Sequence, residues 1–198
     1  MTLNNINMGQ SKNCIQLEPT RKIKIRVDNQ GRVMYVNNYL TEFTGYKVHE
    51  LILKDFSILF DSDMPKMALD KLIELVENEP KAFFIYKGKT KSGECYWGLL
   101  KSTQRIVDNE LTGYNFEIKM LPAVSISKID KLFDIIREIE NNAGLDAANK
   151  YFEGYLEEKG MSFNDFIFDV AEINEKKADQ YFSIDADNEV VKKKKGWF

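Results

Sequence analysis

The hydrophobic positions of the first 120 residues follow two periods, one of two residues and one of three to four. A two-residue period is typical of strands with one buried face, and the longer period is typical of helices. The shorter period is clearest where Tyr114, Phe116 and Ile118 alternate with polar residues. Strands are predicted at 21–27, 32–36, 81–87, 94–104 and 111–120. Two strands, a helical stretch and a three-strand meander predict an α+β fold.

The stretch between the second and third strands carries helix signals. Asn37 follows the second strand and suits a helix N-cap, because its side-chain oxygen accepts a free backbone N–H. Gly45 suits the end of that helix. A longer helix is predicted from Met64 to Asn78, with Asp63 as its cap.

The sequence after residue 122 favours helices throughout. Ser127 and Asp130 are predicted to cap the first of them, a second spans 145–159, and a third starts at Ser162 with Asp165 three residues later. The first helix carries an apolar stripe with Phe133 and Ile135 beside it: Ile129, Leu132, Ile136 and Ile139. This stripe must pack on the chain's own sheet, on the following helices or on a second copy. Because two-fold pairing is the commonest soluble assembly, a homodimer is predicted.

The composition shifts divide the chain into four parts. They predict a polar leader at 1–20, a domain at 21–120, a helical extension at 121–180 and a mobile tail at 181–198. The tail contains Lys192–Lys195, followed by Trp197 and Phe198. Each basic residue contributes about 1 kcal/mol at an acidic membrane surface, so one short cluster binds weakly and a solvated tail is preferred.

Charge and cysteine content narrow the function classes. A net charge of −3 lacks the basic excess expected of a nucleic-acid-binding protein. No apolar run approaches the roughly 20 residues that span a bilayer, and the first residues do not form a signal-peptide pattern. A cytoplasmic location is therefore predicted. Cys14 and Cys95 lie far apart without a Cys-x-x-Cys motif, so neither a zinc site nor a disulfide framework is indicated.

Catalytic and metal-binding patterns are weak in this sequence. His49 is the only histidine and lies in a polar stretch, which favours an exposed side chain. No catalytic triad or phosphate-binding loop can be assembled, so no enzyme activity is predicted. The acidic residues near Asp61 and Asp185 lack the glycine and glutamate of a calcium loop, and Asp185 is interpreted as a surface acid. No metal site is predicted.

The segment from Asp28 to Tyr46 resembles the opening of a PAS domain. The matching residues are the glycine turn at Gly31, the strand after it, Asn37 and the Gly45-Tyr46 pair. The resemblance implies a five-stranded antiparallel sheet with helices on one face, followed here by the helical extension. It also implies a sensing or interaction module.

Two later segments are similar to the aerotaxis-receptor type of PAS domain: the Asp-Met-Pro triplet at Asp63 and the Tyr-Trp pair ending at Trp97. That resemblance implies FAD as the candidate cofactor, held by an arginine, a histidine and an aspartate. Asp63 matches the aspartate, whereas Phe60 stands at the arginine position and Asp61 at the histidine position. These replacements remove two positively polarised donors, so the cofactor is left open.

A ligand pocket is predicted between the long helix and the last three strands. Its expected contacts are Asp63, Met67, Phe84, Trp97 and Phe116, with Phe60 closing the mouth. Pockets are mostly apolar with few polar groups, and the acid would favour a ligand with hydrogen-bond donors. The alternative is that these side chains fill the core.

Taken with the resemblance, the sequence predicts cytoplasmic signal sensing or relay, in response to a small molecule, redox change or partner. The signal would pass through the C-terminal helices or another chain to an unidentified downstream protein. The alternative is a protein-interaction or dimerisation module with a filled core. A small α+β enzyme is a third reading, for which no acid–base pair can be named.

Overall fold

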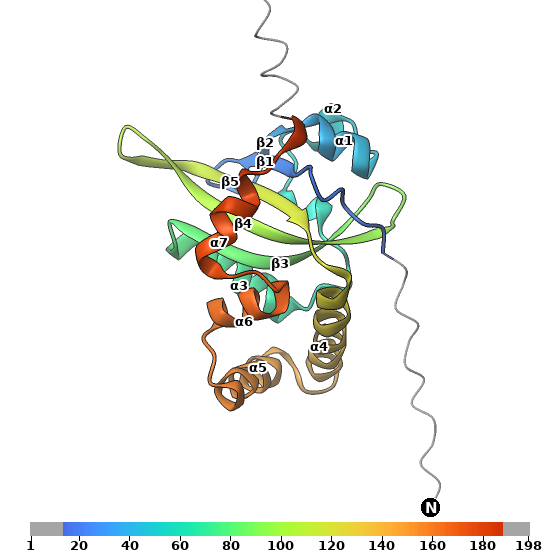
Figure 1. The fold of residues 1–198 in the computed structure, drawn as a ribbon, viewed down its shortest axis with the longest axis vertical. Coiled ribbons are helices and arrows are strands. Elements are labelled where there is room, and N and C mark those ends of the chain that lie inside the picture. The colour runs from blue at the N-terminus through green and yellow to red at the C-terminus, as the bar shows by residue number, and fades with distance from the viewer. Residues whose placement is uncertain (1–13, 188–198) are drawn as a thin grey trace, which may run out of the picture.

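The central element of this protein is one antiparallel sheet of five strands in the order β2-β1-β5-β4-β3 (Figure 1). The computed structural model describes residues 14–187. The strands are β1 (Ile23–Val27), β2 (Val33–Val36), β3 (Lys81–Lys89), β4 (Cys95–Val107) and β5 (Glu110–Met120). Each neighbouring pair is antiparallel, so the fold class predicted from the sequence is confirmed.

The helices between β2 and β3 cover one face of this sheet, called here the inner face. They are α1 (Asn38–Thr44), α2 (Val48–Leu51), the 3-10 helix η1 (Phe56–Leu59) and α3 (Lys66–Asn78). Asn37 caps α1 by accepting the Leu40 N–H, and Gly45 ends it in the left-handed conformation, as predicted. Asp63 is not the cap of α3, which begins after Pro65 and has no side-chain cap of its own.

The helical extension folds back, and most of it packs on the opposite, outer face of the sheet, whereas its second helix packs on α3 and on the helix before it. The extension comprises α4 (Ala123–Ala143), α5 (Leu145–Lys159), α6 (Phe163–Ala171) and α7 (Glu175–Ser183). Phe133 of α4 lies 5.6 Å from Trp97, measured between ring centroids, and Phe168 of α6 and Phe182 of α7 lie 5.0 and 5.9 Å from Phe83. Figure 1 shows α7 crossing the sheet beside β4 and β5.

Three details of the extension differ from the sequence prediction. Helix α4 begins at Ala123 rather than at Ser127, because Pro122 takes the N-cap position and residues 123–126 already have helical geometry. Asp130 therefore lies inside the helix and caps nothing. Helix α7 was not predicted, whereas α5 has the predicted bounds and Ser162 with Asp165 forms the predicted capping box of α6.

The apolar stripe of α4 is used within the chain. Ile129, Leu132, Phe133 and Ile136 are all buried in the core of this single chain. Of the flanking isoleucines, Ile135 remains exposed. The stripe therefore supplies no free surface for a second copy, and the homodimer stays a prediction without this support.

The two cysteines form a disulfide between Cys14 and Cys95, which corrects the sequence interpretation. Eighty-one positions separate them, so no short-range spacing could reveal the pair. The bridge holds the segment before β1 against the start of β4. Residues 1–13 and 188–198, including the lysine cluster of the predicted tail, lie outside the described residues.

Candidate functional site

The aromatic side chains of the inner face pack against one another. Phe116 stacks on Phe56 with 4.7 Å between ring centroids, and Phe60 meets Phe56 and Tyr86 edge-on at 5.0 and 5.6 Å. The Tyr86 hydroxyl donates to the Leu59 carbonyl at 2.6 Å. These contacts fill the space where Phe60 and Phe116 were predicted to line a pocket.

Two other predicted pocket residues, Met67 and Phe84, lie at the edge of the sheet where α3 meets the extension. They line a cavity of about 10 Å³ together with Ile129, Phe133 and Phe166. A volume of this size is roughly that of one water molecule at most.

The remaining two predicted residues lie elsewhere. Trp97 points to the outer face, because successive strand residues alternate sides and its neighbour Tyr96 belongs to the inner face. Asp63 lies in the loop before α3 and turns toward α4. The structure therefore groups Phe60 with Phe116 and Met67 with Phe84, and separates Trp97 from both pairs.

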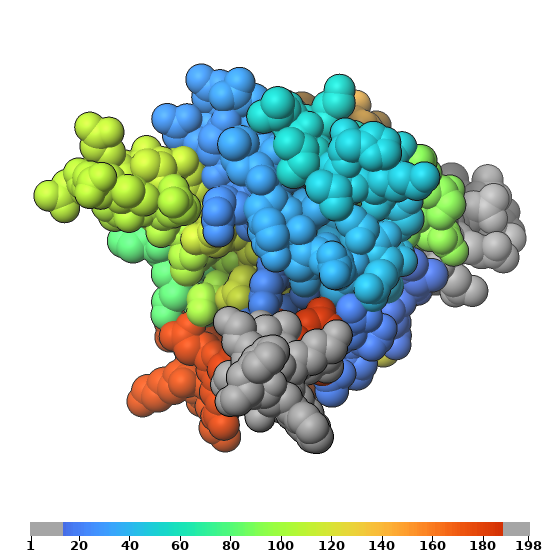
Figure 2. All heavy atoms as spheres, turned by 90° about the horizontal axis from the view of Figure 1, so that it is seen from above, coloured from blue at the N-terminus to red at the C-terminus, as the bar shows by residue number. Residues whose placement is uncertain are grey.

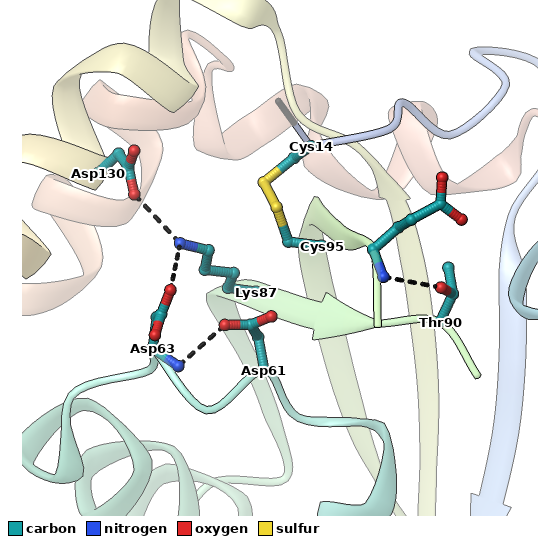
Figure 3. Close-up of a disulfide and its surroundings, with 8 residues drawn as sticks. Cys14, Asp61, Asp63, Lys87, Thr90, Cys95 and Asp130 are labelled. Atoms are coloured by element: carbon teal, nitrogen blue, oxygen red, sulfur yellow. Dashed lines mark hydrogen bonds and ion pairs between the residues drawn. A yellow bond between two sulfur atoms is a disulfide. The ribbon is translucent and has the colours of Figure 1, made fainter. Parts of the chain in front are cut away.

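A buried lysine on the outer face organises the loop that carries Asp63. The Lys87 side chain is 6% exposed, and its Nζ lies 3.2 Å from Oδ1 of Asp130 and 4.0 Å from Oδ2 of Asp63. The same ammonium lies 5.0 Å from the Trp97 ring centroid. Figure 3 shows the Lys87 amine between the two carboxylates, one from α4 and one from the loop.

Helix α4 makes two further polar contacts with this region. Arg137 Nη1 lies 3.4 Å from Asp63 Oδ1. One turn further along, the Glu140 carboxylate accepts the backbone N–H groups of Lys66 and Met67 at 3.0 and 2.7 Å. Glu140 thus supplies the cap that α3 lacks, from a helix more than 60 residues later in the chain. We call Lys87, Asp63, Asp130 and Arg137 the relay cluster.

Of the relay cluster, only Asp63 was predicted from the sequence as a site residue. Asp130 was assigned to a helix cap, and Lys87 and Arg137 were not predicted to have a role. One signal was present: Lys87 continues the otherwise apolar run Phe83–Tyr86 of a buried strand. A lysine is almost never fully buried unless it is paired, so its position predicts an acidic partner. The identity of that partner depended on how α4 packs.

The residues at the flavin-contact positions do not fit an anionic cofactor. Phe60 is part of the inner aromatic cluster. The Asp61 carboxylate is buried and accepts the Asp63 N–H at 2.8 Å, which closes the turn before α3 (Figure 3). Asp63 adds a second negative charge and is engaged by Arg137 and Lys87. Phe60, Asp61 and Asp63 therefore offer the pyrophosphate of a flavin cofactor no positively charged contact.

A second polar arrangement lies on the outer face, where α7 ends. Lys119 is buried and its amine donates to the carbonyls of Tyr181 and Ile184 at 3.1 and 2.9 Å. Lys22 donates to the Phe182 carbonyl at 2.5 Å. The last carbonyls of a helix have no partner inside it, so these two lysines cap α7 from the sheet.

Asp185, interpreted above as a surface acid, is buried just beyond α7. Its Oδ2 lies 2.5 Å from Lys24 Nζ. Lys24 of β1 lies two positions after Lys22 and faces the same outer side of the sheet. Burial, aided by the nearby charge of Lys22, lowers the pKa of Lys119.

Two buried tyrosines and the single histidine are the remaining titratable side chains considered for the site. Burial raises the pKa of the Tyr86 and Tyr96 hydroxyls, so both remain protonated. His49 is exposed, as predicted. Over residues 14–187, no group of three His, Cys, Asp or Glu side chains could hold a metal ion. Within the same range, no helix is both long and apolar enough to cross a membrane.

Comparison with known proteins finds one family model that matches the sheet and its inner helices. Residues 23–117 match the family model described as a PAS domain. No curated protein matches the sequence.

Two solved structures illustrate the similarity. One is a structure from a flavin-analogue study of the light-oxygen-voltage domain mechanism. Its sequence is 14% identical to this chain and the TM-score is 0.50; the alignment covers 56% of this chain and 84% of that structure's chain. The other, the PAS domain of a protein from Colwellia psychrerythraea, is 18% identical with a TM-score of 0.47, covering 50% of this chain and 86% of its own. At these identities the likeness concerns the fold.

Proposed function

We propose that this chain senses or relays a signal without catalysing a reaction, because residues 23–117 match the family model of the PAS domain, a generic sensory and signalling module. The signal would be passed from the sheet into α4 and the helices after it. The cytoplasm is the proposed location. The relay cluster is the observation that carries this proposal.

The relay cluster is suited to coupling because it joins three parts of the molecule. Lys87 belongs to β3, Asp63 to the loop before α3, and Asp130 and Arg137 to α4. Removing one partner of a buried ion pair leaves an uncompensated charge, so the cluster favours one relative position of these parts. A stimulus that shifts the loop would change the preferred position of α4.

The filled inner face constrains the stimulus. A ligand there would have to displace Phe60 from its contacts with Phe56 and Tyr86. A large cofactor is therefore disfavoured, and a partner protein or a redox change suits the core better. If a small ligand does enter, Phe60, Met67, Phe84 and Phe116 remain its proposed contacts. Asp63 and Trp97 would then respond from outside the pocket.

The test compares two ion pairs that each include one residue of α4: the buried pair of Lys87 with Asp130, and the exposed pair of Lys128 with Glu172. Lys87→Met should lower the free energy of unfolding by about 3–5 kcal/mol, since it leaves Asp130 and Asp63 without their buried cation. Hydrogen exchange in α4 and in the first turn of α3 should rise together. The matched control is Lys128→Met, which breaks an exposed pair with Glu172 and should cost at most about 1 kcal/mol.

Two results would contradict the relay. One is an equal loss of stability in both variants. The other is faster exchange in α4 of the Lys87 variant with no change at the start of α3, which would mean that the two elements are not coupled. A double-mutant cycle with Asp130→Asn separates the direct pair from the rest of the cluster.

A second candidate function is a protein-interaction or homodimerisation module. The observation that favours it is the hairpin joining β4 and β5, which projects from the molecule (Figures 1 and 2). It exposes three large apolar side chains, Ile106, Val107 and Leu111. Apolar side chains gathered on a protruding element are typical of contact surfaces.

A further inference from the structure

The Cys14–Cys95 disulfide fastens the N-terminal segment to the sheet. These are the only two cysteines of the chain. Cys95 is 3% exposed at the first position of β4, whereas Cys14 is half-buried. Next to the bridge, the Ile15 N–H donates to the Cys95 carbonyl at 2.8 Å. Ile15 also forms an isolated parallel bridge with Tyr96 and packs against the core.

We call residues 14–21 the strap, because they run from the disulfide to the start of β1. Leu17 is buried in the core, and the Glu18 N–H donates to the Tyr39 hydroxyl at 2.6 Å. At the far end, Arg21 lies over the Tyr39 ring at 4.1 Å from its centroid. The strap is thus fixed at the disulfide, at Leu17 and at Tyr39.

The far end of the strap also holds the segment that follows α7, residues 184–187, which we call the latch. The Thr20 carbonyl accepts the Ala186 N–H at 2.9 Å. Arg21 Nε lies 3.0 Å from the Asp187 carboxylate. Figure 2 shows the end of the described chain, in red, beside the N-terminal segment, in blue.

Two of the sets of contacts that hold helix α7 on the outer face lie at its C-terminal end. The lysines of the sheet, Lys22 and Lys119, cap its last carbonyls, and Phe182 is buried against Phe83. The strap holds the latch just beyond that end. A looser strap removes the second set and leaves α7 with the first set and with the ion pairs that Asp179 and Asp185 make with lysines of the sheet.

We propose that Cys14–Cys95 is a reversible thiol–disulfide site, and that its reduction loosens the strap and frees α7 from the outer face. The stimulus of the chain is then the thiol redox state. This inference deepens the proposed relay function and rests on it. Disulfides are rare in reducing compartments, where those that exist are usually transient or redox-sensing.

The chemistry requires a thiol reductant, either one dithiol or two molecules of glutathione, and a small-molecule disulfide as oxidant. A thiolate of the reductant attacks the half-buried Cys14 sulfur, the bond to Cys95 breaks, and a mixed disulfide forms. The second thiol of the reductant then displaces Cys14. The disulfide has then gained two electrons and two protons, so Cys14 and Cys95 are both thiols, and the reductant leaves as a disulfide. A disulfide such as oxidised glutathione reverses the reaction and leaves as two thiols.

The experiment uses the full chain in buffers of varied ratios of reduced to oxidised glutathione. Alkylation and mass measurement count the free thiols, and hydrogen exchange reports residues 14–21 and 175–187. Both cysteines should titrate together within the ratios of a reducing cytosol. Exchange in the strap, latch and α7 should rise about tenfold or more over the same ratios, and should remain faster than exchange in central β4 and β5.

A double variant, Cys14→Ser with Cys95→Ser, should exchange like the reduced protein at every ratio. If it does not fold, the reduced wild-type chain serves in its place. A pair that stays oxidised at all cytosolic ratios would identify a structural disulfide and overturn the proposal. Titrating thiols with unchanged exchange in α7 would overturn it too. Neither result bears on the Lys87 variants, so the relay function is judged separately.

Discussion

Reduction of the Cys14–Cys95 disulfide should lower the free energy of unfolding substantially. A disulfide stabilises mainly by removing conformations from the unfolded chain, and the effect grows with the length of the loop it closes. Here the loop spans 81 positions. The loop-closure relation then gives an entropy change of about 15 cal/mol/K, which is about 4.5 kcal/mol at 25 °C. This is a large fraction of the roughly 5–15 kcal/mol stability of a typical domain.

Urea unfolding followed by circular dichroism at 222 nm measures this loss. With a slope of about 2 kcal/mol/M, the transition midpoint of the reduced protein should fall by about 2 M. A double variant, Cys14→Ala with Cys95→Ala, should unfold at the midpoint of the reduced protein and should not respond to reductant. Its agreement with the reduced chain would assign the loss to the cross-link rather than to the thiols.

This prediction would be refuted if reduction lowered the free energy of unfolding by less than about 1 kcal/mol. Such a result would mean that the unfolded chain gains little freedom when the bridge opens, contrary to the loop length. It would equally be refuted if the reduced wild-type chain and the alanine variant unfolded at clearly different midpoints.

Asp179 of α7 should make the docking of that helix depend on acid pH, because hydrogen bonds from Lys101 and from a lysine of β3 lower the pKa of its carboxyl from 3.8 to about 2. A lowered pKa stabilises the folded state above about pH 4, and this stabilisation is lost as the pH falls through 2. Asp179→Asn should therefore speed hydrogen exchange in α7 at pH 7, by an amount worth at most about 1 kcal/mol because the ion pair is exposed. Near pH 2 the variant and the wild type should exchange at the same rate. A pH-independent difference would contradict this assignment. The projecting hairpin should mediate self-association, so Ile106→Lys should raise the fraction of monomer measured by sedimentation equilibrium at micromolar concentration. A wild-type chain that is strictly monomeric under these conditions would contradict the predicted homodimer.

Most of the secondary structure could be predicted because its signals are local. Asn37 caps α1 and Ser162 caps α6 within three residues of their partners, so each signal is readable in a short window. The alternation of β5 likewise reports one buried face without reference to other strands. Helix α7 escaped prediction because only Ala178 and Phe182 of its nine residues are buried, which gives too narrow an apolar stripe.

The candidate site could be predicted only in part because its residues come from distant segments. Trp97 was assigned to the same pocket as Phe116, but the pairing of β4 with its neighbours places Trp97 on the outer face. A shift of one residue in that register would have reversed the assignment. Side-chain identity at a strand position therefore does not determine which face the side chain joins.

By itself the sequence determined the α+β order, the PAS resemblance and the helix boundaries that depend on caps, because periodicity and capping act over a few residues. Only the tertiary structure decided that Cys14 meets Cys95 and that Lys87 meets Asp63 and Asp130. Asp185 was predicted to be a surface acid, and the tertiary structure shows that it is buried and paired with Lys24. Such pairs form when whole elements dock, and the burial that makes them strong is set by packing across tens of residues.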